Sequence, residues 1–244
     1  MTETCQITIT LSETTLATLR EAGLDLLVCR AFASSAARAQ PTVWRRITDL
    51  AERISITVGD GCEAYVSHDT TLTEGHPVTF ATLYPVGRGQ TLAVTAASGT
   101  GQVLSTGTPD MIEIFNKTST RFSCGLATAG DTARHPLCAL PLFGNSIALI
   151  RPLPRVLLTV TSRGLAEGSV IRRALAPSLL IDCTGAPDHC REVSYDLDRD
   201  WQANTEGWAS RHPADADLAA LLAQQSNAIS ANADAAPPAE AETP

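Results

Sequence analysis

The chain has 244 residues, a formal net charge of −8 at pH 7, and hydrophobic residues at 44% of its positions. This length fits one large all-β domain, and the hydrophobic fraction is ordinary for a soluble globular protein with a sizeable core. An acidic chain repels phosphate backbones, so nucleic acid is not expected as the main ligand. The sequence also contains no run of about 18 apolar residues, so no transmembrane segment is predicted.

The first residues, MTETCQITITLSETT, contain neither the basic stretch nor the apolar stretch of a signal peptide. A cytoplasmic protein is therefore expected. In a reducing compartment the seven cysteines are mostly small, buried, apolar residues. Cys183 and Cys190 stand on either side of a predicted turn, where a local disulfide is geometrically feasible.

One short helix is predicted near the N-terminus. Residues 7–11, ITITL, alternate as a strand does, and Ser12 then provides an N-cap. The helix is expected over 13–22, with Gly23 as its C-terminal stop. The segment LDLLVCRAF at 24–32 is apolar nearly throughout and predicts a buried strand.

Three pairs of strands are predicted as hairpins because turn residues join them. Asp60–Gly61 joins the first pair, PVGRG the second, and the polar cluster FNKTST the third, with Asn116 suited to positive φ. The pairs are 54–59 with 62–68, 76–84 with 90–97, and the two halves of 111–128. The segment at 98–110 is rich in Gly, Ser and Thr and is predicted as a loop.

More strands are predicted in the second half, and Pro152 and Pro154 mark an edge or a bend between the first two of them. Adjacent leucines at 157 and 158, and at 179 and 180, must send one side chain to each face of a strand. Both faces of these strands are therefore expected to be covered. The predicted strands are 146–153, 155–162, 169–176, 178–184 and 191–197.

These elements predict a mainly β fold, an antiparallel β-sandwich or a flattened barrel over residues 1–212. An amphipathic C-terminal helix is expected over 213–229, because Pro213 suits a helix start and leucines follow at helical spacing. Residues 230–244 contain Ala, Pro and acidic residues without apolar bulk, and this composition predicts a disordered tail.

Asp196, Asp198 and Asp200 alternate along a predicted strand, so their carboxylates would share one face as a Ca²⁺ site requires. Trp201 stands where an EF-hand loop has glycine, so a solvated acidic strand edge is the alternative. Trp201 and Trp208 could form one aromatic ligand-binding patch, or they could cap the open end of the sandwich.

Arg172 and Arg173 form one of only two adjacent arginine pairs in the chain, and they are candidate ligand-binding residues within an acidic protein. The cluster IDCTGAPDHC at 181–190 does not have the paired ligand spacing of a zinc site. The sequence has no GxSxG motif and no P-loop lysine. No cofactor is therefore predicted.

Three functions are consistent with these patterns. The first is a β-sandwich that binds a small molecule or a protein partner, with self-association into a homo-oligomer left open. The second is a cofactor-independent enzyme that acts on a small molecule in a β-lined cavity. The third is a toxin-like, membrane-active sandwich.

Overall fold

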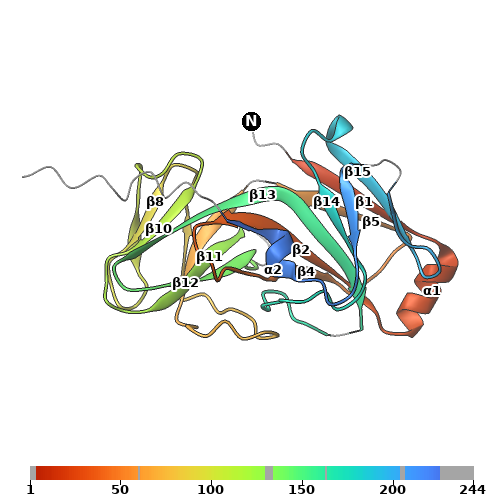
Figure 1. Cartoon of the computed structure of the whole chain (residues 1–244), viewed down its shortest axis with the longest axis horizontal. Helices are drawn as coiled ribbons and strands as arrows, with labels where there is room; N and C mark the ends of the chain where they lie inside the picture. Colours follow the sequence, from red (N-terminus) through yellow and green to blue (C-terminus); the bar gives the residue numbers. More distant parts are fainter. Residues whose placement is uncertain (1–3, 60, 130–133, 163, 204–206, 226–244) are drawn as a thin grey trace, which may run out of the picture.

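The computed structural model describes residues 4–59, 61–129, 134–162, 164–203 and 207–225 (Figure 1). Strands in three mostly antiparallel sheets dominate this part of the chain, together with two short helices, and none of the described sheets closes into a barrel. The predicted mainly β, antiparallel fold with a short helix near each end is confirmed.

The strands are short except for one in the middle of the chain. They are β1 (Cys5–Leu11), β2 (Asp25–Ser34), β3 (Gln40–Pro41), β4 (Val43–Ile47), β5 (Arg53–Val58), β6 (Cys62–Ser67), β7 (Thr82–Pro85), β8 (Thr91–Val94), β9 (Gly101–Leu104), β10 (Ile112–Asn116), β11 (Phe122–Thr128), β12 (Cys138–Leu142), β13 (Ser146–Thr161), β14 (Ser178–Asp182), β15 (Cys190–Asp196), β16 (Asp200–Ala203), β17 (Ala209–His212) and β18 (Ala223–Gln225). The helical segments are α1 (Glu13–Glu21), the 3₁₀ segment η1 (Pro187–His189) and α2 (Leu218–Leu222).

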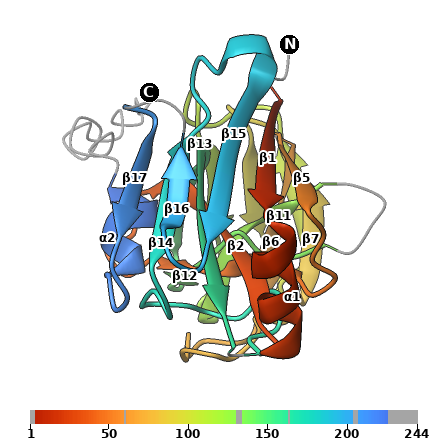
Figure 2. The same ribbon diagram turned by 90° about the vertical axis from the view of Figure 1, so that its right-hand side faces the viewer.

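The first sheet has the strand order β16-β15-β1-β5, and Figure 2 shows β15, β1 and β5 side by side. The second sheet has nine strands, with the path β17-β14-β13-β10-β8-β9 and a branch through β2 to β4 and β18. The third has the order β3-β12-β11-β6-β7. Parallel pairing occurs between β1 and β15, β8 and β10, and β2 and β18. One large apolar cluster draws residues from all three sheets.

The predicted strands at 146–153 and 155–162 are in fact one strand, β13, which runs through the middle of the molecule (Figure 1). The register of β13 against β2 shifts between Pro152 and Val156. Proline has no N–H to donate to a neighbouring strand, so the irregularity places Pro154 where no ladder hydrogen bond is needed. The prolines bend this strand instead of ending it.

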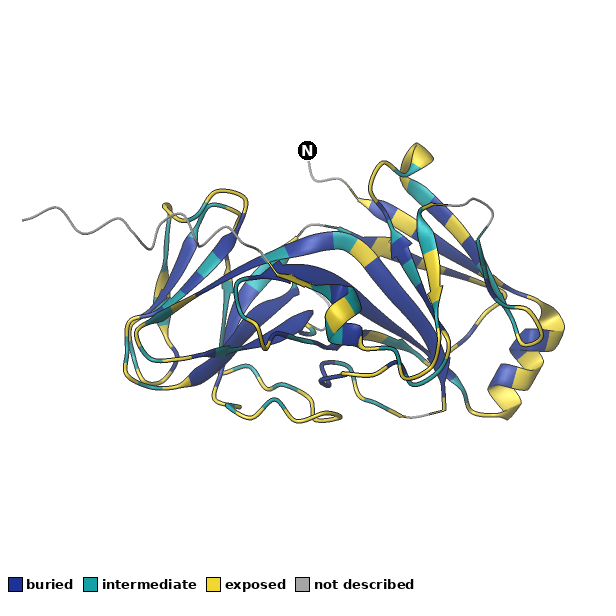
Figure 3. Ribbon diagram, viewed as in Figure 1, coloured by how far each residue is buried: buried dark blue, intermediate teal, exposed yellow. Residues whose placement is uncertain are grey.

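Both faces of β13 are covered, as the leucine pairs predict (Figure 3). Leu158 packs in the large core cluster, whereas Leu157 packs on the opposite face in a second cluster with Leu218 and Leu222 of α2. Helix α2 therefore forms part of the layer on the second face. Leu180 of the neighbouring strand is only partly buried against that second cluster.

The three predicted hairpins are wrong, although their strands exist. Strands β5 and β6 belong to different sheets, and so do β7 and β8, and β10 and β11. The turn residues reverse the chain, but each following strand crosses to another sheet. The segment predicted as a loop at 98–110 contains β9, which pairs with β8 as a hairpin.

Strand β10 ends at Asn116, which does not have the positive φ that was predicted. Its side chain instead stabilises the segment in which the chain crosses from the second sheet to the third. Its Nδ2 donates to the carbonyl oxygens of Thr120 at 2.7 Å and Phe143 at 2.9 Å, and its Oδ1 accepts from the Thr118 N–H at 3.0 Å. This fully buried amide ties the end of β10 to the turn before β13.

The N-terminal helix forms as predicted, because the Ser12 side chain accepts a hydrogen bond from the Thr15 N–H at 3.2 Å and Gly23 has a φ of 62°. The C-terminal helix is shorter than predicted. Residues 213–217 form a turn, Asp217 caps the five-residue helix α2, and β18 then pairs with β2. Residues 226–229 of the predicted helix, and the tail at 230–244, lie outside the described residues.

Candidate functional site

The two tryptophans do not form a surface patch. Trp201 in β16 is completely buried, with its ring 4.9 Å from that of Tyr195 and its indole N–H donating to the Pro177 carbonyl oxygen at 3.3 Å. Trp208 is half-buried, and the Arg191 guanidinium lies 4.9 Å from its ring centroid. The structure thus places Trp201 in the core, because burial of a large aromatic ring stabilises the fold.

The three aspartates surround a turn and do not alternate along one strand. Asp196 ends β15 and pairs with Asp200 at the start of β16, while Asp198 lies in the turn between them. The Asp196 carboxylate accepts from the Asp198 N–H at 3.0 Å and from the Thr15 hydroxyl at 3.2 Å. The hydrogen bond from Asp198 is the main cause that lowers the pKa of Asp196.

The Asp196 oxygens already stabilise the turn and its contact with α1. In the part of the chain that the structure describes, no group of three or more His, Cys, Asp or Glu residues is arranged to hold a metal ion.

The predicted pair Arg172 and Arg173 lies in a cavity of about 530 Å³ that two further arginines line, Arg38 and Arg121. We call this cavity the arginine pocket. The residues lining it are Arg38, Gln40, Thr70, Thr71, Leu72, Arg121, Pro141, Arg172, Arg173, Asp217 and Ala219. Four arginines therefore line one cavity in a chain whose net charge is −8.

The pocket arginines come from irregular segments that strands and α2 hold in place. The segment at 169–176 is predicted as a strand but makes only isolated bridges, among them Arg173 with Asp217. Ile171 and Ala174 are buried, so the segment is anchored on both sides of the arginine pair while both arginine side chains remain exposed. The Leu218 N–H also donates to the Arg172 carbonyl oxygen at 2.9 Å, which attaches α2 to this segment.

Three of the four pocket arginines contact neutral groups. Arg172 donates to the Leu72 carbonyl oxygen at 2.9 Å, and Arg173 donates to the Asp215 carbonyl oxygen at 3.0 Å. The Arg121 guanidinium lies 5.0 Å from the ring centroid of Phe143. These contacts orient the side chains without neutralising them.

No ion pair involves the four pocket arginines among the residues that the structure describes. The ion pairs found there involve other residues, as in Arg46 with Asp25 and Arg155 with Asp182. Asp217 lines the pocket, but its carboxylate accepts hydrogen bonds from the first N–H groups of α2. A guanidinium has five N–H donors, so the pocket keeps donors and positive charge for an anion.

A second cavity, also of about 530 Å³, shares Thr70, Thr71 and Leu72 with the arginine pocket. His68, Asp69 and His76 line it. Asp69 accepts from the Thr79 N–H at 2.8 Å, and the His68 ring lies 5.3 Å from that of Phe122. Two histidines therefore line a cavity that adjoins the arginine pocket.

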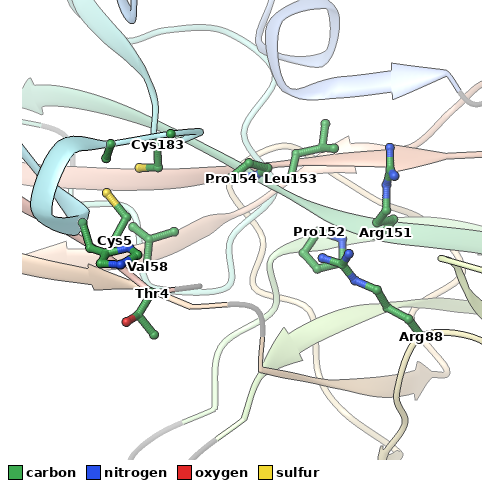
Figure 4. A pocket seen from close by; sticks show the side chains of 12 residues that line it. Thr4, Cys5, Val58, Arg88, Arg151, Pro152, Leu153, Pro154 and Cys183 are labelled. Atoms are coloured by element: carbon green, nitrogen blue, oxygen red, sulfur yellow. The ribbon is translucent and has the colours of Figure 1, made fainter. Parts of the chain in front are cut away.

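A third cavity, of about 310 Å³, lies between the first and second sheets and contains Cys5, Cys183, Arg88 and Arg151 (Figure 4). All seven cysteines of the chain are free, so the local disulfide between Cys183 and Cys190 is not formed. The thiol of Cys183 instead faces that of Cys5 (Figure 4).

No protein-family model, curated protein or solved structure matches this chain. None of its described helices has the length and apolar character needed to cross a membrane.

Sequence analysis identified Arg172 and Arg173 because they are adjacent, but it missed Arg38 and Arg121. Each of these is a single arginine in a loop, and only the fold brings it to the pair.

Proposed function

We propose that this protein binds a small molecule carrying two or more phosphate or carboxylate groups in the arginine pocket. The observation that carries the proposal is that four arginines line one cavity, and none of them forms an ion pair within the part of the chain that the structure describes. Placing several like charges together is unfavourable in the empty protein, and a multiply charged anion relieves this repulsion.

The chemistry of arginine supports an anionic, oxygen-rich ligand. A guanidinium donates two parallel N–H bonds to a carboxylate or a phosphate, and such charge-assisted bonds are stronger than neutral ones. The hydroxyls of Thr70 and Thr71 and the amide of Gln40 line the same cavity and can donate to further ligand oxygens. The cavity volume of about 530 Å³ is within the usual range for small-molecule sites.

The test is a titration calorimetry series on the full chain with pyrophosphate, citrate and an uncharged sugar. We expect at least one of the two anions to bind and the sugar not to bind. Pyrophosphate and citrate distinguish a phosphate ligand from a carboxylate ligand. Binding should weaken as ionic strength rises, since exposed charges are screened by salt.

The double variant Arg172→Gln/Arg173→Gln should lower the affinity for the bound anion by about 100-fold or more, because each lost charged hydrogen bond costs about 1.5–3 kcal/mol. The matched control is Arg53→Gln/Arg199→Gln, which removes the same charge from exposed positions outside the pocket. The proposal is wrong if neither anion binds, or if the control variant weakens binding as much as the pocket variant does.

A second candidate is an enzyme that acts on the bound anion, and the observation in its favour is the adjoining cavity with His68 and His76. Imidazole is the commonest general acid or base at neutral pH. We expect such an enzyme to release phosphate from phosphate esters, and His76→Gln to lower turnover by about 100-fold or more while anion affinity is retained. If phosphate is released no faster with the protein than in buffer alone, anion binding without catalysis is the function.

A further inference from the structure

The cavity between the first and second sheets has two chemically different ends (Figure 4). We call it the thiol pocket. Cys5 and Cys183 lie at one end, and Arg88 and Arg151 lie at the other, with prolines of β13 between them. None of the residues lining this pocket lines the arginine pocket, so the two sites are independent.

Two thiols from distant parts of the chain meet at the first end. Cys5 is the first residue of β1 in the first sheet, and Cys183 directly follows β14 in the second sheet. Both thiols line the same cavity, and Figure 4 shows the two sulfur atoms pointing toward one another. Each residue retains 6% exposure, whereas Cys29, Cys124 and Cys138 are completely buried.

The opposite end is positively charged. Arg88 is exposed in the loop before β8, and Arg151 belongs to β13. Among the described residues, the buried Nε of Arg151 has no hydrogen-bond partner. Val58 and Leu153 line the same cavity and give it apolar walls. A molecule that fills this space would carry an anionic group at one end and a sulfur-reactive group at the other.

We propose that Cys5 and Cys183 are a redox-active dithiol, which a small carboxylate-bearing disulfide oxidises after docking against Arg88 and Arg151. The Cys5 thiol loses its proton, and its sulfur attacks one sulfur of the small disulfide to form a mixed disulfide while the other half leaves as a thiolate and takes up a proton. The Cys183 sulfur then attacks the Cys5 sulfur and releases the second half as a thiol. Two protein thiols are oxidised and one small disulfide is reduced to two thiols.

The product is a covalent link between the first and second sheets. A crosslink between residues so far apart in sequence constrains the unfolded chain strongly. The oxidised protein should therefore unfold at a temperature roughly 5–15 °C higher than the reduced protein. Dithiothreitol should reverse this shift.

The exchange should be slow at neutral pH and faster at alkaline pH. Burial raises the pKa of the Cys5 thiol, and the hydrogen bond with Cys183 and the nearby Arg191 guanidinium lower it in part. Burial raises the pKa of Cys183 further, and the contact with Cys5 adds to this increase. Because the thiolate is the attacking species, the rate should increase as pH rises from 7 to 9.

The experiment incubates the reduced full chain with oxidised glutathione at pH 8.5 and maps the disulfides by mass spectrometry. Trypsin leaves Cys183 and Cys190 in one peptide, and subsequent cleavage before Asp188 separates them. We expect a Cys5–Cys183 link, which Cys5→Ser and Cys183→Ser abolish and Cys190→Ser leaves in place. The same reagent applied to the chain unfolded in urea shows that it can oxidise these cysteines.

The role of charge is tested with the uncharged reagent 2-hydroxyethyl disulfide. Arg88→Gln/Arg151→Gln should slow oxidation by glutathione disulfide about two- to fivefold per charge removed, and it should leave the rate with the uncharged reagent unchanged. Arg53→Gln is the control. A disulfide that involves Cys190, or no disulfide in the folded protein, would overturn the proposal that Cys5 and Cys183 are a redox-active dithiol. Equal slowing of oxidation with both reagents would overturn the proposal that the reagent docks against the two arginines.

Discussion

We expect Gly125→Ala to prevent the chain from reaching a stable folded state. A Cβ at this position of β11 would lie 2.0 Å from the Cys138 carbonyl oxygen and 2.7 Å from the Tyr65 ring. Cys138 and Tyr65 are completely buried, and the Tyr65 hydroxyl already donates to that carbonyl oxygen at 2.7 Å. Neither neighbour can move without disturbing the third sheet.

The expected loss exceeds about 4–5 kcal/mol, which is exceptional for one substitution and is comparable with a total stability of roughly 5–15 kcal/mol. Soluble yield and urea unfolding measure this loss. Gly59→Ala is the matched control, because its added Cβ would meet no atom closer than 3.5 Å. A Gly125→Ala protein as stable as the Gly59→Ala protein would show that β11 and β12 are not packed as described.

Leu157→Ala and Leu158→Ala should each lower the free energy of unfolding by about 2–5 kcal/mol. Both side chains are completely buried, although they point to opposite faces of β13. Each truncation removes apolar contact and leaves a cavity in a different cluster. Urea unfolding measures the change in stability, and the slope of the unfolding free energy against urea concentration should stay unchanged.

The comparison with the β14 leucines makes this prediction sharper. Leu179→Ala should cost as much as Leu158→Ala, since Leu179 packs in the large cluster. Leu180→Ala should cost less, because Leu180 is only partly buried. If Leu157→Ala were as mild as Leu180→Ala, the second face of β13 would not be covered by α2 and its neighbours.

The strands could be predicted from sequence because their signal is local. Alternation in ITITL and the apolar run at 24–32 correspond to β1 and β2, and the Ser12 cap correctly identifies α1. Strand pairing is not local. Turn residues such as Asn116 show where the chain reverses, but which sheet receives the next strand depends on the burial of both faces by residues far away in sequence.

The residues of the candidate site could likewise be predicted only where their signal is local in sequence. Arg172 and Arg173 were detectable as neighbours in sequence, whereas Arg38 and Arg121 join them only through the fold. The tryptophan prediction failed for Trp201 because sequence alone does not distinguish an aromatic residue in the core from one on the surface. The aspartates do not alternate along one strand as predicted, because they surround a hairpin turn, where Asp196 accepts hydrogen bonds from the chain itself.

The most direct measurement of anion binding is a crystal structure of the full chain soaked in tungstate. Tungstate is a dianion with the tetrahedral shape of phosphate, and its anomalous signal locates it without ambiguity. We expect the strongest peak in the arginine pocket, within hydrogen-bond distance of at least two of the guanidiniums of Arg38, Arg121, Arg172 and Arg173. An empty arginine pocket, with tungstate bound only elsewhere on the molecule, would contradict the proposed function.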